Sequence, residues 1–369
     1  MKVTLIGPVY PYRGGIAHYN ASLAQALVDA GHTVRLISFR RQYPSRLYPG
    51  KSDKDPSTEP LSFPAEYILD PIYPWTWLHA ARTIGRDLPD LVVFHWWTTF
   101  WAPAYAILAY LLRQKGLRLA YLIHNVLPHE ARPWDRLMAR RTLTQGHAFI
   151  VQTPQEQKRL LAIIPQANVK FCTLPMYRPF SDQVITKTEA REQLSLPGRN
   201  IILLCFGIVR PYKGLKILIE AMASVPEPVH LIVAGEFWED KTAYLRQIEE
   251  LHLSKQVTIL DRYIPNEEAH RLFSAADALI APYVDGTRSA AAGVALGYKL
   301  PLIVTDIVAA GIDPVNHPRL QVVPAGDAAA LTPAISSFVE RLPALAEPTL
   351  SIPDDWGKLV NVIEEIANG

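Results

Sequence analysis

The chain has 369 residues, which is enough for two or three domains, and we expect two. Hydrophobic residues make up 49% and charged residues 20%, as is typical of a globular protein with a large core. A net charge of +2, without a block of lysines and arginines, argues against a surface built for nucleic acid. The two cysteines, Cys172 and Cys205, lie in apolar stretches, which indicates reduced core thiols and no disulfide framework.

The first segments predict a strand at 3–7, a helix at 16–30 and a strand at 33–38. Such a βαβ opening is typical of a Rossmann-like parallel sheet, although GxGxxG is absent. Gly14 and Gly15 stand directly before the helix, where they form either a turn that a phosphate or substrate can approach or a simple tight turn. The chain begins directly with a strand and without the pattern of a signal peptide. We therefore expect a cytoplasmic protein, with attachment to the inner face of the membrane left open.

Further elements of the first half follow from apolar periodicity: helices at 74–86, 99–114, 134–144 and 154–164, and strands at 91–94, 117–123 and 148–152. Residues 40–64 have no apolar period and predict a long loop, in which Arg40, Arg41, Arg46 and Lys51 would suit a lipid phosphate at an anionic membrane. The aromatic stretch at 67–101 fits an aromatic sugar platform, a membrane-facing patch or core packing.

Two histidines follow predicted strands of this half. His95 lies beside two tryptophans and is either a packed core histidine or a catalytic group. His124 opens a loop that contains Asn125, and there it could bond a sugar hydroxyl or stabilise charge on a leaving group.

Residues 176–200 predict a linker, and a second α/β series follows. Its strands are expected at 201–206, 229–234, 257–260, 278–281, 301–304 and 320–323, and Asn266 is expected to cap a helix. An amphipathic helix is expected at 354–367. Polar residues follow several strands, where doubly wound sheets bind ligands: Arg210, Lys213, Glu236 and Thr287-Arg288-Ser289. We expect two Rossmann-like, doubly wound parallel-sheet α/β domains facing a cleft.

The stretch at 205–215 joins a buried strand to a helix that the apolar spacing places at 213–222. It holds Gly207, Arg210, Lys213 and Gly214. Glycines allow close backbone approach, and a helix N-terminus with two cations suits a phosphate group. The alternative is a solvated basic turn. The patterns of a P-loop, of a serine nucleophile elbow and of a structural zinc site are absent.

Several motifs in this order resemble the GT-B fold glycosyltransferases, in particular bacterial members of glycosyltransferase family 4, the group 1 type. They are Gly-Pro-x5-Gly-Gly ending at Gly15, Phe-Gly-x-x-Arg-Pro-Tyr-Lys-Gly ending at Gly214, the segment 276–283, and the helix after Ser289 that leads to Pro301-Leu-Ile-Val-Thr-Asp306. The resemblance covers essentially the whole chain. It implies an acceptor-side domain at 1–177, a nucleotide-sugar domain at 178–353 and a final helix at 354–369 that crosses back to the first domain.

The resemblance also implies roles for single residues. Lys213 and Arg210 would neutralise the donor diphosphate, with Gly207 in the same loop, and Gly15, next to Gly14, would offer its N–H to those phosphates. His124 matches the family histidine near the transferred sugar. The loop Arg262-Tyr263-Ile264 would hold the base. The implied enzyme is a retaining hexosyltransferase in polysaccharide biosynthesis that uses a nucleotide-sugar as co-substrate and no cofactor or metal. Its partners would be a glycan or lipid-linked acceptor and the membrane surface, with no nucleic acid.

The chain departs from the family pattern in two respects. Many relatives carry Gly-Arg where this chain has Gly207-Ile208, with Arg210 two residues later, and the second departure is more serious. The family's Glu-x7-Glu pair falls at Gly286 and Val294, so both carboxylates are absent. The entry to the following helix, at Thr287, Arg288 and Ser289, could still meet a phosphate with hydroxyl and N–H groups. The alternative function is a catalytically inactive sugar- or nucleotide-binding protein of the same fold. A third interpretation is a GT-B epimerase or phosphorylase. A phosphorylase would be expected to carry a pyridoxal-binding lysine motif, and the sequence has none.

Overall fold

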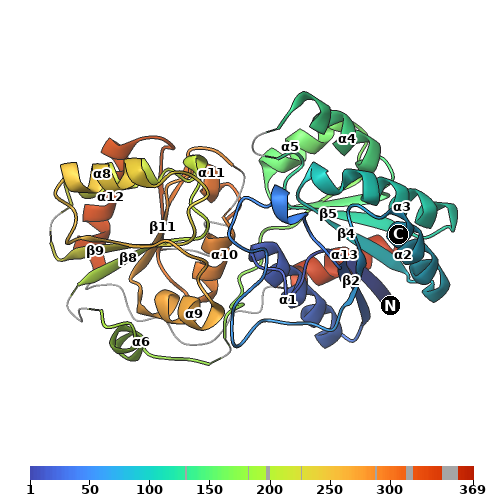
Figure 1. Cartoon of the computed structure of the whole chain (residues 1–369), viewed down its shortest axis with the longest axis horizontal. Coiled ribbons are helices and arrows are strands. Elements are labelled where there is room, and N and C mark those ends of the chain that lie inside the picture. The colour runs from blue at the N-terminus through green and yellow to red at the C-terminus, as the bar shows by residue number, and fades with distance from the viewer. Residues whose placement is uncertain are drawn as a thin grey trace. The chain divides into compact units, whose positions relative to one another are not determined.

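The computed structural model describes residues 1–128, 131–181, 183–196, 200–225, 227–286, 289–312, 319–342 and 356–369. The chain divides into two compact units, drawn in Figure 1. Unit 1 comprises Met1–Asp55, Pro60–Pro175 and Asp355–Gly369, and unit 2 comprises Pro56–Glu59 and Met176–Asp354. In the described ranges, no helix is both long enough and apolar enough to span a bilayer.

Unit 1 is built on a parallel sheet with the strand order β3-β2-β1-β4-β5-β6-β7. All residues of β4, β5 and β6 are buried, which explains why these strands read as continuous apolar runs. The strands are β1 (Lys2–Ile6), β2 (Thr33–Phe39), β3 (Glu66–Leu69), β4 (Leu91–Trp96), β5 (Leu119–Ile123), β6 (Ala148–Val151) and β7 (Val169–Phe171). The short outer strands β3 and β7 were not expected from the sequence.

Helices cover both faces of this sheet: α2 to α5 form a layer on one face, and α1 and α13 lie on the other (Figure 1). One hydrophobic core cluster of the unit packs between the sheet and the α2–α5 layer. The helices are α1 (Gly15–Asp29), α2 (Pro74–Asp87), α3 (Ala102–Gln114), α4 (Pro133–Leu143), α5 (Pro154–Ile163) and α13 (Gly357–Asn368), with 3-10 turns η1 (Ser45–Leu47) and η2 (Thr99–Trp101).

Unit 2 contains a second parallel sheet with the order β10-β9-β8-β11-β12-β13. Its strands agree with the expected ranges to within one residue: β8 (Ile201–Phe206), β9 (Val229–Ala234), β10 (Val257–Leu260), β11 (Ala278–Ala281), β12 (Leu302–Thr305) and β13 (Leu320–Val323). The two-domain Rossmann-like α/β fold expected from the sequence is confirmed.

One hydrophobic core cluster of unit 2 lies between its sheet and α7, α8 and α12. The helices are α6 (Lys187–Gln193), α7 (Leu215–Met222), α8 (Thr242–Glu250), α9 (Asn266–Ala275), α10 (Ala290–Gly297), α11 (Asp306–Ala309) and α12 (Ala328–Arg341), with the 3-10 turn η3 (Pro211–Lys213). The segment expected to be a linker instead contains α6. Its Arg191 is 2.5 Å from the buried Asp277 carboxylate, and this ion pair ties the helix to the unit.

Two helix starts differ from the sequence-based expectation. α7 begins at Leu215, because Gly214 adopts a left-handed conformation and ends a separate 3-10 turn that contains Lys213. Asn266 is the first residue of α9 and not its cap. The hydroxyl oxygen of Ser57 accepts a hydrogen bond from the Asn266 backbone N–H at 2.8 Å, so a distant segment of the unit supplies the cap.

Both sheets reverse their strand order beside their first strand, at β1/β4 in unit 1 and at β8/β11 in unit 2. In doubly wound sheets, the crevice outside the carboxyl ends of the strands at this switch point is where ligands bind. The loops that follow these four strands are therefore the first places to search for function.

Candidate functional site

In the loop after β8, the ammonium group of Lys213 lies against the backbone of Gly207. Gly207 has a φ of +103°, and a Cβ added there would lie 2.9 Å from the Lys213 Nζ. A side chain at position 207 would thus compete with the ammonium group, besides adopting a backbone conformation that favours glycine. The sequence-predicted pair Gly207 and Lys213 is brought together at the carboxyl end of β8.

A second glycine joins this loop to the loop after β11. Gly214 has a φ of +70°, and a Cβ there would lie only 1.9 Å from the carbonyl oxygen of Pro282. The backbone N–H of Val284 donates a hydrogen bond to the carbonyl of Tyr212 at 2.8 Å. The loops that flank the switch point of unit 2 are therefore bound directly to each other.

Aromatic rings lie beside both cations of the loop. The guanidinium carbon of Arg210 is 5.7 Å from the ring centroid of Trp238, and the Nζ of Lys213 is 5.4 Å from that of Tyr283. Burial raises the pKa of the Cys205 thiol to about 11, and the positive charge of Lys213 opposes this rise. The Lys213 charge thus lies close to the carboxyl end of β8.

The start of α10 is organised by Ser289. Its Oγ accepts a hydrogen bond from the Ala292 N–H at 3.2 Å and is 3.0 Å from the Tyr283 hydroxyl. Burial raises the pKa of Tyr283 well above its usual range, so the phenol keeps its proton. Ser289 therefore caps the helix, as its position before the helix suggests. The predicted Thr287 and Arg288 lie outside the described residues.

The two positions where the family carries carboxylates hold no acid. Gly286 adopts a φ of +113°, and Val294 is buried inside α10. The neighbouring Asp285 uses one carboxylate oxygen to accept the N–H of Gly286 at 2.6 Å. In the described residues 281–286 and 289–297, Asp285 is the only acid.

The other predicted residues of unit 2 follow the next two strands. Glu236 is buried after β9, where its carboxylate accepts a hydrogen bond from the Trp238 indole at 3.2 Å. After β10, Arg262 forms an ion pair with Glu268 at 2.6 Å, and this hydrogen bond raises the pKa of the guanidinium. Tyr263 is partly buried and Ile264 is buried. The base-holding role implied by the resemblance stays a prediction for this loop.

In unit 1, the two histidines of adjacent strands meet. The Nδ1 of His95 and the Nε2 of His124 are 2.9 Å apart, and the rings stack with an interplanar angle of 25°. Both side chains are buried. Only one hydrogen fits between the two nitrogens, so the two rings cannot both be cations, and each ring restricts the tautomer of the other.

Tyr19 from α1 lies over this histidine pair. Its ring is perpendicular to that of His124 at a centroid distance of 5.4 Å, and the Gln152 amide donates to its hydroxyl at 2.7 Å. Trp356, just before α13, packs on the other side of the tyrosine at 4.9 Å. His124 is therefore held on several sides by residues distant in sequence.

The predicted pair Gly14 and Gly15 forms the N-terminus of α1. Gly14 has a φ of +110°, and no side chain caps the helix. His18, one turn into α1, has its Nε2 at 3.4 Å from the buried Asp55 carboxylate. The first N–H groups of α1 therefore form a helix N-terminus that can bind an anion, in the same unit as the histidine pair.

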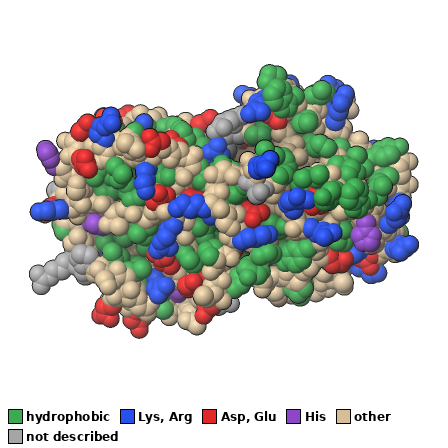
Figure 2. Space-filling view, in the orientation of Figure 1, with side chains coloured by type: hydrophobic (Ala, Val, Ile, Leu, Met, Phe, Trp, Pro, Cys, Tyr) green, Lys and Arg blue, Asp and Glu red, His purple; other side chains and the backbone are tan. Residues whose placement is uncertain are grey.

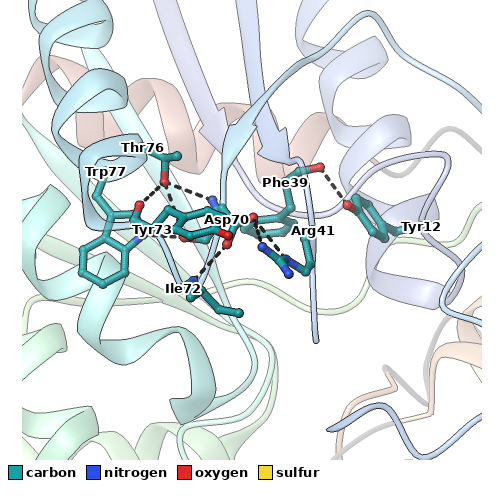
Figure 3. Close-up of polar contacts among 8 residues, drawn as sticks. All are labelled: Tyr12, Phe39, Arg41, Asp70, Ile72, Tyr73, Thr76 and Trp77. Atoms are coloured by element: carbon teal, nitrogen blue, oxygen red, sulfur yellow. Dashed lines mark hydrogen bonds and ion pairs between the residues drawn. The ribbon is translucent and has the colours of Figure 1, made fainter. Parts of the chain in front are cut away.

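Part of the basic loop at 40–64 is already neutralised, as Figure 3 shows. Arg41 binds the buried Asp70 at 2.8 Å, and this contact raises the pKa of its guanidinium. The same aspartate accepts the Ile72 N–H through its carboxylate, at 2.9 Å, and the Trp77 indole through its carbonyl, at 2.7 Å. Arg41 therefore anchors the start of α2, which reduces its value as a ligand for an acceptor phosphate.

Sequence reasoning missed four residues of these sites. Trp238 and Tyr283 lie beside the cations of unit 2; in unit 1, Tyr19 packs on His124 and Gln152 hydrogen-bonds Tyr19. Tyr283 alone had a signal, since it ends the motif at 276–283. In the parts of the chain that the structure describes, no group of three or more His, Cys, Asp or Glu side chains is placed to hold a metal ion.

Two family models match the chain. Residues 14–175 match the Glycosyl transferase 4-like domain, and residues 200–341 match Glycosyl transferases group 1. A GDP-mannose:glycolipid 4-beta-D-mannosyltransferase of Xanthomonas campestris pv. campestris is 26% identical over 208 residues, which are 54% of this chain and 53% of the relative. The chain thus aligns with about half the length of the curated relatives it first matches.

Solved structures share the fold over the whole chain. The catalytic domain of starch synthase IV of Arabidopsis thaliana, bound to ADP and acarbose, has a TM-score of 0.71 at 16% identity, covering 100% of this chain and 98% of that one. The Anabaena protein Alr3699/HepE in complex with UDP and glucose has a TM-score of 0.69 at 16% identity, covering 100% and 95%. At these identities, the likeness shows the fold alone.

Replacing Gly214 with alanine tests the junction of the two loops in unit 2. Because the new Cβ would lie 1.9 Å from a carbonyl oxygen, we expect Gly214→Ala to displace the loop and to destabilise the protein by roughly 3 kcal/mol, judged from overpacking and positive-φ costs. Gly326→Ala is the matched control, since Gly326 has a φ of +80° and open space around its Cβ position. Urea unfolding measures both variants, and equal losses would show that the close approach is unimportant.

Proposed function

The chain belongs to the group 1 glycosyltransferases of the GT-B fold, and from that premise we propose that it moves a hexose from a nucleotide-sugar to a glycan or lipid-linked acceptor, with retention at the anomeric carbon. Glycosyl transfer follows from the family. The retention, the hexose and the acceptor class are the proposed parts, and each needs its own support.

The observation that carries the proposal is the cationic glycine loop after β8. Arg210 and Lys213 lie with Gly207 at the switch point of unit 2, beside the N-terminal turn of α7. Two positive charges over exposed backbone can neutralise the charge that develops on a departing nucleoside diphosphate. We therefore propose that these side chains do the work that a divalent metal does in other transferases. The solved proteins that carry UDP or ADP support a nucleotide donor.

His124 is the proposed catalytic residue, because it stands at the end of β5 and is held in one orientation. The contact with His95 fixes its ring through the nitrogen Nε2, at 2.9 Å. A fixed imidazole can hydrogen-bond a sugar hydroxyl in the transition state without the entropic cost of ordering a mobile side chain. His95 is then a positioning residue that acts through His124.

The remaining predicted residues would complete the donor site. We propose that Ser289 and the start of α10 add to the phosphate contacts, that Glu236 contacts the donor sugar and that the loop Arg262-Tyr263-Ile264 borders the base. The N–H groups at Gly14 and Gly15 are the proposed anion contacts of unit 1. Helix ends suit this role because their first N–H groups lack partners in the helix.

A lipid-linked acceptor is supported by the Xanthomonas relative, whose name describes a glycolipid substrate. We propose that the chain acts in polysaccharide or glycolipid assembly, in the cytoplasm at the inner face of the membrane. The second candidate function is an inactive sugar- or nucleotide-binding protein, which Gly286 and Val294 favour because they replace the family's carboxylates. Release of sugar from the donor in the absence of acceptor would distinguish an active enzyme from such a binder.

Lys213→Ala tests the phosphate assignment. A hydrogen bond to a charged group contributes about 1.5–3 kcal/mol, so we expect kcat/KM to fall roughly 10- to 150-fold. The assay uses the donor that most raises the melting temperature in a panel of nucleotide-sugars. Lys216→Ala is the matched control, because Lys216 is exposed on α7 and its Nζ lies 5.5 Å from the Tyr244 ring. If both variants turn over like the wild type, Lys213 does not bind the diphosphate.

Substitutions of His95 test the positioning role. We expect His95→Ala to lower kcat about tenfold or more with little change in the KM for the donor, since the loss falls on the transition state. His95→Asn should recover much of that rate, because its amide can still hydrogen-bond His124 near the place of Nδ1. If His95 has a purely structural role, both variants should have lower melting temperatures than the wild type, and His95→Asn should not restore kcat.

A further inference from the structure

We propose that the outer face of α4, together with the adjoining part of α3, is a docking surface for an anionic lipid bilayer. The proposal deepens the proposed function, since a lipid-linked acceptor lies at such a surface, but its test measures lipid binding without the enzymatic reaction. It starts from the charges and apolar side chains that unit 1 exposes between η2 and the end of α5.

Carboxylates are missing from the described surface of residues 99–164. The only described acids in this range, Asp135 and Glu156, are both buried. Asp135 accepts the Arg132 N–H at 2.7 Å, and Glu156 binds Arg159 at 2.9 Å. Both carboxylates are therefore bound by other groups of the protein. The exposed charged side chains of the same range are all basic: Arg113, Lys115, Arg132, Arg136, Arg140, Arg141 and Lys158.

Large apolar side chains are exposed among these cations. On α4, Trp134 is 54% and Leu137 51% exposed, and Met138 is exposed beside them. Positions 134, 137 and 138 fall on one face of a helix. Ile107 and Tyr110 are exposed on α3, the neighbour of α4 in the helical layer. Figure 2 shows green side chains gathered over α3 and α4 with blue ones at their borders.

Unit 2 lacks this combination in its described residues. Its exposed large apolar side chains are only valines and a leucine: Val184, Leu245, Val284 and Val322. On α8, Leu245 is accompanied by the exposed acids Glu249 and Glu250. Within the described residues, the combination on α4 therefore has no counterpart in unit 2.

The chemistry of this face favours a bilayer over other anionic partners. Tryptophan with arginine is the pairing that proteins place at the boundary between lipid headgroups and acyl chains. The Arg132 guanidinium lies 5.3 Å from the Trp134 ring, so charge and ring are presented together. Nucleic acid would leave Leu137 and Met138 without apolar partners. A second copy of the chain would bring the three arginines of α4, and Arg132 just before it, against the same four side chains of the other copy.

Vesicle co-sedimentation of the full chain tests the proposal. We expect binding to vesicles that contain phosphatidylglycerol, weak binding to pure phosphatidylcholine, and a decrease as salt is raised. Each arginine near such a surface contributes about fivefold in partition, so Arg140→Gln with Arg141→Gln should lower the partition coefficient roughly thirtyfold. Trp134→Ala should lower it about tenfold through lost apolar burial.

The control makes the same kinds of change on another helix. Leu245→Ala with Arg246→Gln alters exposed residues of α8, and we expect wild-type partition for this variant. Melting temperatures close to that of the wild type confirm that the variants fold. The proposal is overturned if the α4 variants partition like the wild type, if the α8 variant loses as much, or if phosphatidylcholine binds equally well. Binding to duplex DNA without binding to vesicles would also overturn it.

Discussion

The contact between Gly214 and the carbonyl of Pro282 is the constraint on which the cationic loop of unit 2 depends. A Cβ at position 214 would lie 1.9 Å from that oxygen, so the two loops at the switch point can meet only because the residue is glycine. Their junction holds the 3-10 turn that carries Lys213, and places Tyr283 within 5.4 Å of its ammonium. The cation is therefore positioned by backbone geometry and an aromatic ring.

Unit 1 uses the same principle at its own switch point. A Cβ at Gly7 would lie 3.0 Å from the Cβ of His95, so the loop after β1 closes tightly over β4. His95 is thereby held against His124, which Tyr19 and Gln152 secure from other elements. Each unit thus presents polar side chains at the carboxyl ends of the strands at its switch point, while most buried side chains of its sheet are apolar.

The strands of unit 2 and its cationic loop could be predicted from the sequence, because buried parallel strands are short apolar runs bounded by glycine, proline or polar residues. It could not reveal contacts that fold topology creates. Ser57 caps α9 from 209 positions away, and Gln152 reaches Tyr19 across 133. The sequence favoured a packed core histidine over a catalytic group at position 95, and the structure shows a buried ring that contacts His124 directly. The membrane-docking surface likewise could not be recognised from the sequence, because only the fold shows that Asp135 and Glu156 are buried.

The central claim is that unit 2 recognises a diphosphate through Arg210 and Lys213, and calorimetric titration in EDTA tests it most directly. UDP, GDP and ADP would each be compared with the corresponding monophosphate on the full chain. We predict that at least one diphosphate binds about tenfold or more tightly than its monophosphate, from one added charge-assisted contact, and that Lys213→Ala removes this difference. Equal affinities for all pairs, or a difference that appears only when Mg²⁺ is added, would contradict the account.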